Sequence, residues 1–114
     1  MKDDTLYLIH VQECLRKIKD FTAGGRNVFF SDLKTQDAVL RNLQTLSEST
    51  QRLSNELKSA NGDIPWQDIS DFRNVLVHDY LGVNPERVWE IVEHHLPGFS
   101  MRVDQLLRKL KPNQ

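Results

Sequence analysis

The decisive stretch of this sequence is Arg73-Asn74-Val75-Leu76-Val77-His78-Asp79-Tyr80. Together with Ile69 and Phe72 before it, its apolar residues go most of the way round a helix, which is typical of the most buried helix in a small protein. Polar side chains on such a helix are costly unless something satisfies them. The arginine, the histidine and the tyrosine of this stretch are therefore the first candidates for chemistry.

Length and composition bound the class of protein. The 114 residues fit one domain, residues 1–114, with a single modest core. Hydrophobic residues make up 39% and charged residues 27%, as in ordinary globular proteins, and no apolar run approaches the roughly 18 residues that span a bilayer. The start, Met1-Lys2-Asp3-Asp4, is acidic where a secretory signal is basic. We expect a cytoplasmic protein that does not contact a membrane.

Charge and cysteine content narrow the choice further. With 15 basic and 16 acidic residues the formal charge is -1, which argues against non-specific coating of nucleic acid but leaves room for local basic patches. The single cysteine, Cys14, lies on an apolar stripe of the first expected helix, so we predict a buried structural thiol rather than a nucleophile. Two basic clusters stand out: Arg16, Lys17, Lys19 and Arg26, and Arg102, Arg108, Lys109 and Lys111.

The N-terminal half shows two long helical patterns. Apolar residues recur on one helix face over residues 3–22, and the glycine pair that follows predicts the end of this helix. Val28-Phe29-Phe30 is interpreted as a short apolar connector. Ser31 or Asp32 is expected to cap a second helix, whose apolar stripe continues to Leu57 over about seven turns.

The C-terminal half predicts three helices. Ile64-Pro65-Trp66 opens the central helix, because proline is tolerated in a first turn, and this helix is expected to end at residues 81–83. Asn84-Pro85-Glu86 is a strong start signal for the next helix, and Leu96-Pro97-Gly98 is expected to break it before a last helix that reaches Leu110. No segment alternates with period two. The predicted fold class is therefore all-α, an antiparallel bundle of four or five helices.

The polar residues of the central helix suit phosphodiester cleavage. Arg73 and Tyr80, seven apart, share a helix face, whereas Arg73 and His78 lie about 140° apart, so they could flank a groove but could not pinch one atom. A guanidinium matches phosphate with a planar fork, and an imidazole, with an unperturbed pKa of about 6.5, acts as acid or base near neutral pH. The pattern lacks paired carboxylates and metal-ligand spacings, so we expect no metal and no cofactor.

On the residues alone, a structural interpretation competes with the catalytic one. Arg73 can pair with Asp71 or Asp79, and His78 can be a core histidine whose hydrogen bonds are satisfied. The remaining histidines show no ligand spacing, and surface or interface roles are expected for them: His10, His94 and His95.

The stretch also resembles a known motif. Its spacing is that of the R-x-x-x-x-H-x-Y motif of HepT-like proteins in the HEPN superfamily, with the polar Asn74 directly after the arginine. The similarity extends over nearly the whole chain. Its other elements are Ile64-Pro65-Trp66, Val88-Trp89-Glu90-Ile91 followed by Leu96-Pro97, and Arg41-Asn42-Leu43.

This resemblance implies a fold, an activity and partners. It implies a HEPN-type bundle and a metal-independent endoribonuclease that acts on RNA as the toxin of a toxin-antitoxin pair. Arg73 and His78 would be the catalytic pair, with Asn74 in support. The toxin would form a homodimer, and its antitoxin would be a minimal nucleotidyltransferase (MNT) that AMPylates the tyrosine corresponding to Tyr80.

A single histidine in the motif prompts a hypothesis about the dimer. Attack of a ribose 2′-hydroxyl on the neighbouring phosphate needs a base and an acid. A twofold dimer would bring two copies of His78 and Arg73 to one groove, so that each imidazole takes one role. Two other functions stay open: a non-catalytic helical dimerisation module that binds a nucleotidyltransferase, and a nucleotide-binding subunit that presents substrate to it.

Overall fold

The structure, a computed structural model, describes residues 2–77 and 84–110, with side chains for residues 3–72 and 84–110. Over these residues the chain forms helices and no strand, which confirms the all-α prediction. The elements are α1 (Lys2–Phe21), α2 (Arg26–Ser31), α3 (Leu33–Gln51), α4 (Asn55–Ala60), α5 (Trp66–Val77), α6 (Pro85–Glu90), the π-helical η1 (Ile91–His95) and α7 (Leu96–Leu110).

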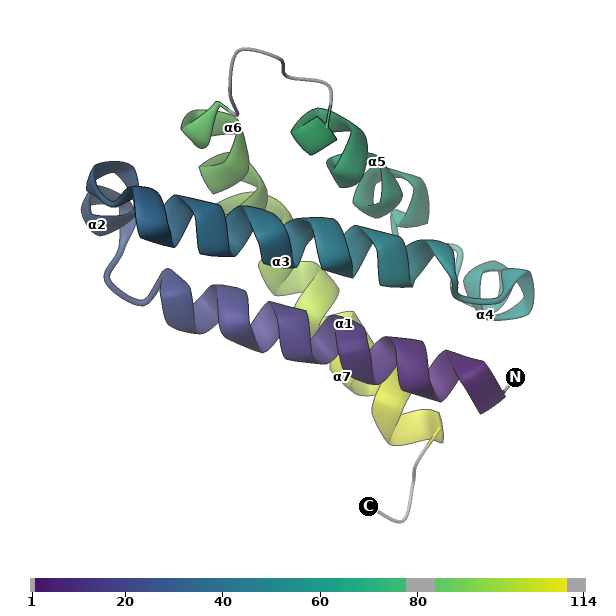
Figure 1. The fold of residues 1–114 in the computed structure, drawn as a ribbon. Helices are drawn as coiled ribbons and strands as arrows, with labels where there is room; N and C mark the ends of the chain where they lie inside the picture. Colours follow the sequence, from purple (N-terminus) through teal and green to yellow (C-terminus); the bar gives the residue numbers. More distant parts are fainter. Residues whose placement is uncertain (1, 78–83, 111–114) are drawn as a thin grey trace.

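Four long elements make the bundle (Figure 1). α1 and α3 lie side by side and run antiparallel, α5 packs on α3, and α7 packs on α1. α6, η1 and α7 follow one another without interruption and act as the fourth long element. The short helices α2 and α4 lie at the two ends of α3.

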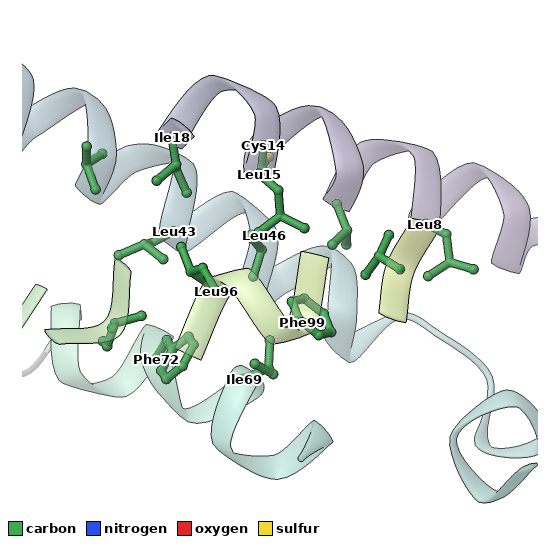
Figure 2. Close-up of a cluster of buried hydrophobic side chains, with 14 of the residues drawn as sticks. Leu8, Cys14, Leu15, Ile18, Leu43, Leu46, Ile69, Phe72, Leu96 and Phe99 are labelled. Carbon is green, nitrogen blue, oxygen red and sulfur yellow. The ribbon is translucent and has the colours of Figure 1, made fainter. Parts of the chain in front are cut away.

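The core lies where these four elements meet (Figure 2). Burying one large apolar side chain contributes about 1.5–3 kcal/mol, so this shared cluster, more than helix propensity, holds α5 against its neighbours. Figure 2 shows side chains of α1, α3, α5 and α7 converging on one another. Its labelled members are Leu8, Cys14, Leu15, Ile18, Leu43, Leu46, Ile69, Phe72, Leu96 and Phe99.

Buried polar groups add specific ties between helices. The fully buried Ser47 hydroxyl of α3 donates to the Ile69 carbonyl of α5 at 2.9 Å. The buried Asp4 carboxylate of α1 accepts from the Ser54 amide at 2.8 Å and from the Ser54 hydroxyl at 2.6 Å. Because buried polar groups must be hydrogen-bonded, these contacts fix the position of α5 and α4 relative to the first pair of helices.

Two expectations for the N-terminal half are wrong. Val28-Phe29-Phe30 is not a connector but part of the short helix α2, which follows the left-handed Gly25 (φ 90°) and buries Phe29. The long second helix is interrupted between Gln51 and Asn55, because Ser54 starts a new helix by accepting from the Leu57 amide at 3.1 Å. The apolar stripe continues across this interruption, so periodicity alone did not reveal it. The predicted cap at Asp32 is confirmed.

The predicted break at Leu96-Pro97-Gly98 is also wrong. The chain stays helical through Pro97, and the Leu96 amide bonds to the Ile91 carbonyl five residues earlier, as in a π-helix. In a regular helix the proline ring clashes with the carbonyl four residues before it and leaves that carbonyl without its donor. The wider π-turn placed just before Pro97 accommodates both effects, so the helix continues instead of ending.

Candidate functional site

The motif lies at the C-terminal end of α5. The backbone of Arg73 and Asn74 is helical and belongs to the last five described residues of α5 (Trp66–Val77), and the predicted end of this helix at residues 81–83 lies outside the described residues. The side chains of these two residues, and the whole of His78 and Tyr80, lie outside the described residues. The joint position of the arginine and the imidazole therefore stays a prediction, and what the structure gives is the frame around them.

α5 is held at successive turns up to the residue before Arg73. At its start the Trp66 indole N–H donates to the Asn61 carbonyl at 3.0 Å, and its ring meets Phe99 of α7 edge-on at 6.1 Å. One turn later Ile69 is 1% exposed. Phe72 is 6% exposed and packs edge-on against the ring of His95, with 5.6 Å between the ring centroids. Arg73 therefore directly follows the anchored part of α5.

α6 is anchored just as firmly on the other side of residues 78–83. Asn84 caps it by accepting from the Glu86 amide at 3.0 Å, and Pro85 occupies the first turn, as the sequence predicts. Val88 and Trp89 are buried, and the Trp89 ring lies 5.2 Å from the ring of Phe29 in α2. The segment that contains His78 and Tyr80 therefore connects two fixed points of the bundle.

A depression of about 280 Å³ lies between α5, which carries the motif, and the α6–η1 segment. Its charged groups are mainly acidic, and Arg87 is bound within 3.5 Å by Glu90. Taken by themselves, these described groups would repel a phosphate. We call this surface the α5–α6 depression, and its lining residues are Asp68, Asp71, Phe72, Arg87, Glu90, Ile91 and His95.

The structure adds residues that the sequence reasoning missed. His95, for which a surface or interface role is expected, is exposed and packs on Phe72 from the end of the π-helix η1. A π-turn has no reliable sequence signature, although Pro97 shortly after it could have suggested one. Within the described part of the chain, no group of three or more histidine, cysteine, aspartate or glutamate residues could hold a metal ion.

Cys14 behaves as predicted. It is 7% exposed on α1, and burial raises the pKa of its thiol above the ordinary value. A thiol with a raised pKa carries little thiolate at neutral pH and is a poor nucleophile. Within residues 2–77 and 84–110, no helix has both the length and the apolar character that crossing a membrane requires.

Comparison with known proteins gives a consistent result. The family model "Ribonuclease HepT-like" matches residues 11–106. A "Probable ribonuclease HepT" of Thermococcus cleftensis is 31% identical over 88% of this chain and 92% of its own length. The "mRNA nuclease HepT" of Shewanella oneidensis is 26% identical over 82% of this chain and 88% of its own length.

Another relative is a longer protein, of which this chain matches only a part. A protein of Methanocaldococcus jannaschii, named as a gamma-glutamylcyclotransferase together with a candidate RNase, is 28% identical over 99% of this chain. The chain spans 51% of that protein, about half of its length. No solved structure matches the chain.

Proposed function

The chain belongs to the HepT-like ribonuclease family, and on that premise we propose that it is a metal-independent endoribonuclease that acts as the toxin of a toxin-antitoxin pair. The observation that carries the proposal is the family match over residues 11–106, which contains the whole of the Arg73–Tyr80 motif. The helical placement of Arg73 and Asn74 at the end of a firmly packed α5 supports it.

In this proposal Arg73 and His78 carry the chemistry. The guanidinium of Arg73 binds the scissile phosphate and stabilises the negative charge that grows on it in the transition state. One imidazole takes the proton of the ribose 2′-hydroxyl as its oxygen attacks phosphorus, and a second gives a proton to the departing 5′-oxygen. The products are a 2′,3′-cyclic phosphate and a free 5′-hydroxyl. Asn74 supports the pair.

The second imidazole comes from a second copy of the chain. The motif holds one histidine, and a twofold homodimer would bring His78 of both protomers to one groove. The anchoring of α5 up to Phe72 and of α6 from Asn84 supports this arrangement, because it fixes the helices on either side of the motif segment in each copy.

The same proposal includes a regulatory partner. An MNT-type nucleotidyltransferase antitoxin would attach AMP to the hydroxyl of Tyr80, two residues after His78. The AMP ester would add bulk and negative charge beside Arg73 and would repel an RNA phosphate. Intact mass of the protein made with and without the antitoxin tests this step: an increase by whole AMP units that Tyr80→Phe abolishes is expected, and an unchanged mass contradicts it.

The nuclease proposal is tested by incubating single-stranded RNA with the purified protein in excess EDTA. We expect cleavage by the wild type and a loss of about 10²-fold or more with Arg73→Ala, the scale of losing one transition-state donor. Absence of cleavage by the wild type would contradict the proposal and favour the dimerisation module, or, if the free protein binds nucleotide, the substrate-presenting subunit.

Mixed dimers test the shared groove. Wild-type chains combined with an excess of His78→Ala chains should be almost inactive, because every mixed groove lacks one imidazole. Activity that stays at half of the wild-type value per mixed dimer would show that each chain works alone. His10→Ala, which alters an exposed histidine of α1, serves as the matched control and should give mixed dimers of full activity.

A further inference from the structure

A second open surface lies on α7, away from the motif. It is a groove of about 630 Å³ between the second half of α7 and the turn that precedes α5. We call it the α7 groove, and its lining residues are Asn61, Arg102, Gln105, Leu106, Arg108 and Lys109. All of these except Leu106 carry hydrogen-bond donors, and none is acidic, which is the opposite of the α5–α6 depression.

Hydrogen bonds and an ion pair hold the side chains on the floor of the α7 groove. The Arg102 side chain, 30% exposed, donates from Nη1 to the Asp63 carboxylate at 2.9 Å and from Nη2 to the Asn61 side-chain oxygen at 3.4 Å. Asn61 is itself fixed, because its side-chain amide donates to the Leu57 carbonyl at 2.9 Å. The buried Nε of Arg102 has no hydrogen-bond partner among the described residues.

The rim of the groove carries two exposed cations, Arg108 and Lys109. Arg108 and Lys109 are exposed, and within the described part of the chain neither has a carboxylate within ion-pair distance. Asp63, which does not line the groove, forms an ion pair with Arg102 at 2.9 Å. Cations at the end of a helix are stabilised by its dipole, which explains their residue type. It does not explain why they face an open groove lined with further donors.

We propose that the α7 groove binds the phosphate backbone of single-stranded RNA; this rests on the proposed nuclease function and extends its substrate contact beyond the motif. The chain has a net charge of -1, so long-range attraction of RNA is absent and a polyanion must be held by local cations. Guanidinium, ammonium and amide groups around an open groove suit phosphate and ribose oxygens.

The position of the groove determines which RNA lengths can contact both the groove and the motif. Figure 1 shows the C-terminal end of α7 on the opposite side of the molecule from the C-terminal end of α5. The molecule measures 42 Å along its longest axis. Even at the roughly 3.4 Å per phosphate of a strand in a double helix, a 20-nucleotide RNA is longer than this axis, whereas a 4-nucleotide RNA is far shorter. The groove therefore contributes to binding of a long RNA and leaves a short oligonucleotide unaffected.

The test is binding of a fluorescent 20-nucleotide RNA and a 4-nucleotide RNA at several salt concentrations. All proteins are full-length chains in a His78→Ala background, which prevents cleavage during the measurement. Arg108→Gln/Lys109→Gln removes two charges and keeps side-chain length. Lys17→Gln/Lys34→Gln removes two exposed charges from α1 and α3 and is the matched control.

We expect the groove variant to bind the 20-nucleotide RNA about fivefold more weakly near physiological salt. The slope of log Kd against log salt should fall by about 1.4, because each lost phosphate contact removes about 0.7. The 4-nucleotide RNA and the control variant should show no change. An unchanged slope and affinity for the long RNA would overturn the proposal, and so would inorganic phosphate that competes as well as RNA does per phosphate group.

Cleavage measured separately distinguishes this proposal from the nuclease proposal. If chains with His78 intact cleave no RNA but the groove variant still loses salt-dependent binding, the α7 groove stands and the nuclease function fails. If the wild type cleaves RNA and the groove variant binds and cleaves the long substrate normally, the nuclease function stands and the groove proposal fails.

Discussion

The α5–α6 depression and the α7 groove are two polar surfaces whose described lining residues carry opposite charge. Among the described lining residues, Asp68, Asp71 and Glu90 outnumber the basic groups of the first surface, whereas the second has Arg108 and Lys109 and no acidic residue. Cation and anion counts for the whole chain nearly cancel, so this separation is invisible in the net charge. If the α7 groove binds RNA as proposed, this separation of charge would hold the strand on one part of the molecule and repel it from another.

The largest expected effect separates the rate of RNA cleavage from the affinity for RNA. Arg73→Lys keeps a positive charge but loses the planar fork, so the rate of cleavage should fall about tenfold or more while the affinity for long RNA stays within about twofold. The Arg108→Gln/Lys109→Gln variant should show the reverse, with normal cleavage of a short RNA. Single-turnover cleavage and equilibrium binding measure the two quantities. Equal losses of cleavage rate and of RNA affinity in both variants would contradict separate roles for the motif and the α7 groove.

The next effect concerns the support of the motif. Phe72 packs on His95 and ends the anchored part of α5, so Phe72→Ala should lower the free energy of unfolding by about 3–5 kcal/mol. Urea unfolding at neutral pH gives this value. Val28→Ala, at a side chain that is 45% exposed, is the matched control and should change stability by no more than about 0.5 kcal/mol. A small effect of Phe72→Ala would show that α5 is held elsewhere.

A smaller effect should come from the acidic surface itself. Asp68→Asn, Asp71→Asn and Glu90→Gln together remove three negative charges from the α5–α6 depression. The 20-nucleotide RNA should then bind about two- to threefold more tightly at low salt, and the gain should vanish at high salt, because screening hides exposed charges. Weaker binding would contradict this prediction, because it would show that the carboxylates favour RNA binding.

The smallest effect is a pH dependence away from both surfaces. A hydrogen bond from Thr35, then one from the Lys34 amide, lowers the pKa of the Asp32 carboxyl that caps α3. A lowered pKa in the folded state means that the stabilisation is present above the unfolded pKa and is lost as pH falls through the folded pKa. Asp32→Asn retains a capping oxygen without titrating, so its urea midpoint should fall less than that of the wild type between pH 6 and pH 2.5. Equal falls would contradict this assignment.

Periodicity predicted the long elements because burial follows the helical repeat. The stripe of α1, the cap at Asp32 and the start signal at Asn84 are all found where the sequence places them. The two incorrect helix boundaries lie where local backbone contacts override the apolar pattern. Ser54 starts a new helix although the apolar stripe runs on, and the π-turn before Pro97 rescues a helix that proline normally ends. The start of α4 is also tied to α1 by hydrogen bonds from Ser54 to Asp4, a tertiary contact that no local pattern contains.

The candidate site was predictable in part. The spacing of Arg73, His78 and Tyr80 pointed to a ribonuclease family, and the family match bears out that recognition. The basic residues of α7 were visible as a cluster in the sequence, but the groove was not, because it needs the turn around Asn61 to come next to α7. The contact of His95 with Phe72 was equally hidden, since it joins helices more than twenty residues apart.

The central claim is that a histidine and an arginine of one motif cut RNA without a metal. Its most direct test is the mass of the fragments released from a defined RNA by the purified protein in excess EDTA. The account predicts 5′-fragments that end in a 2′,3′-cyclic phosphate for the wild type and for His10→Ala, and intact RNA for His78→Ala. Fragments produced equally by His78→Ala, or ending in a 3′-hydroxyl, would contradict it.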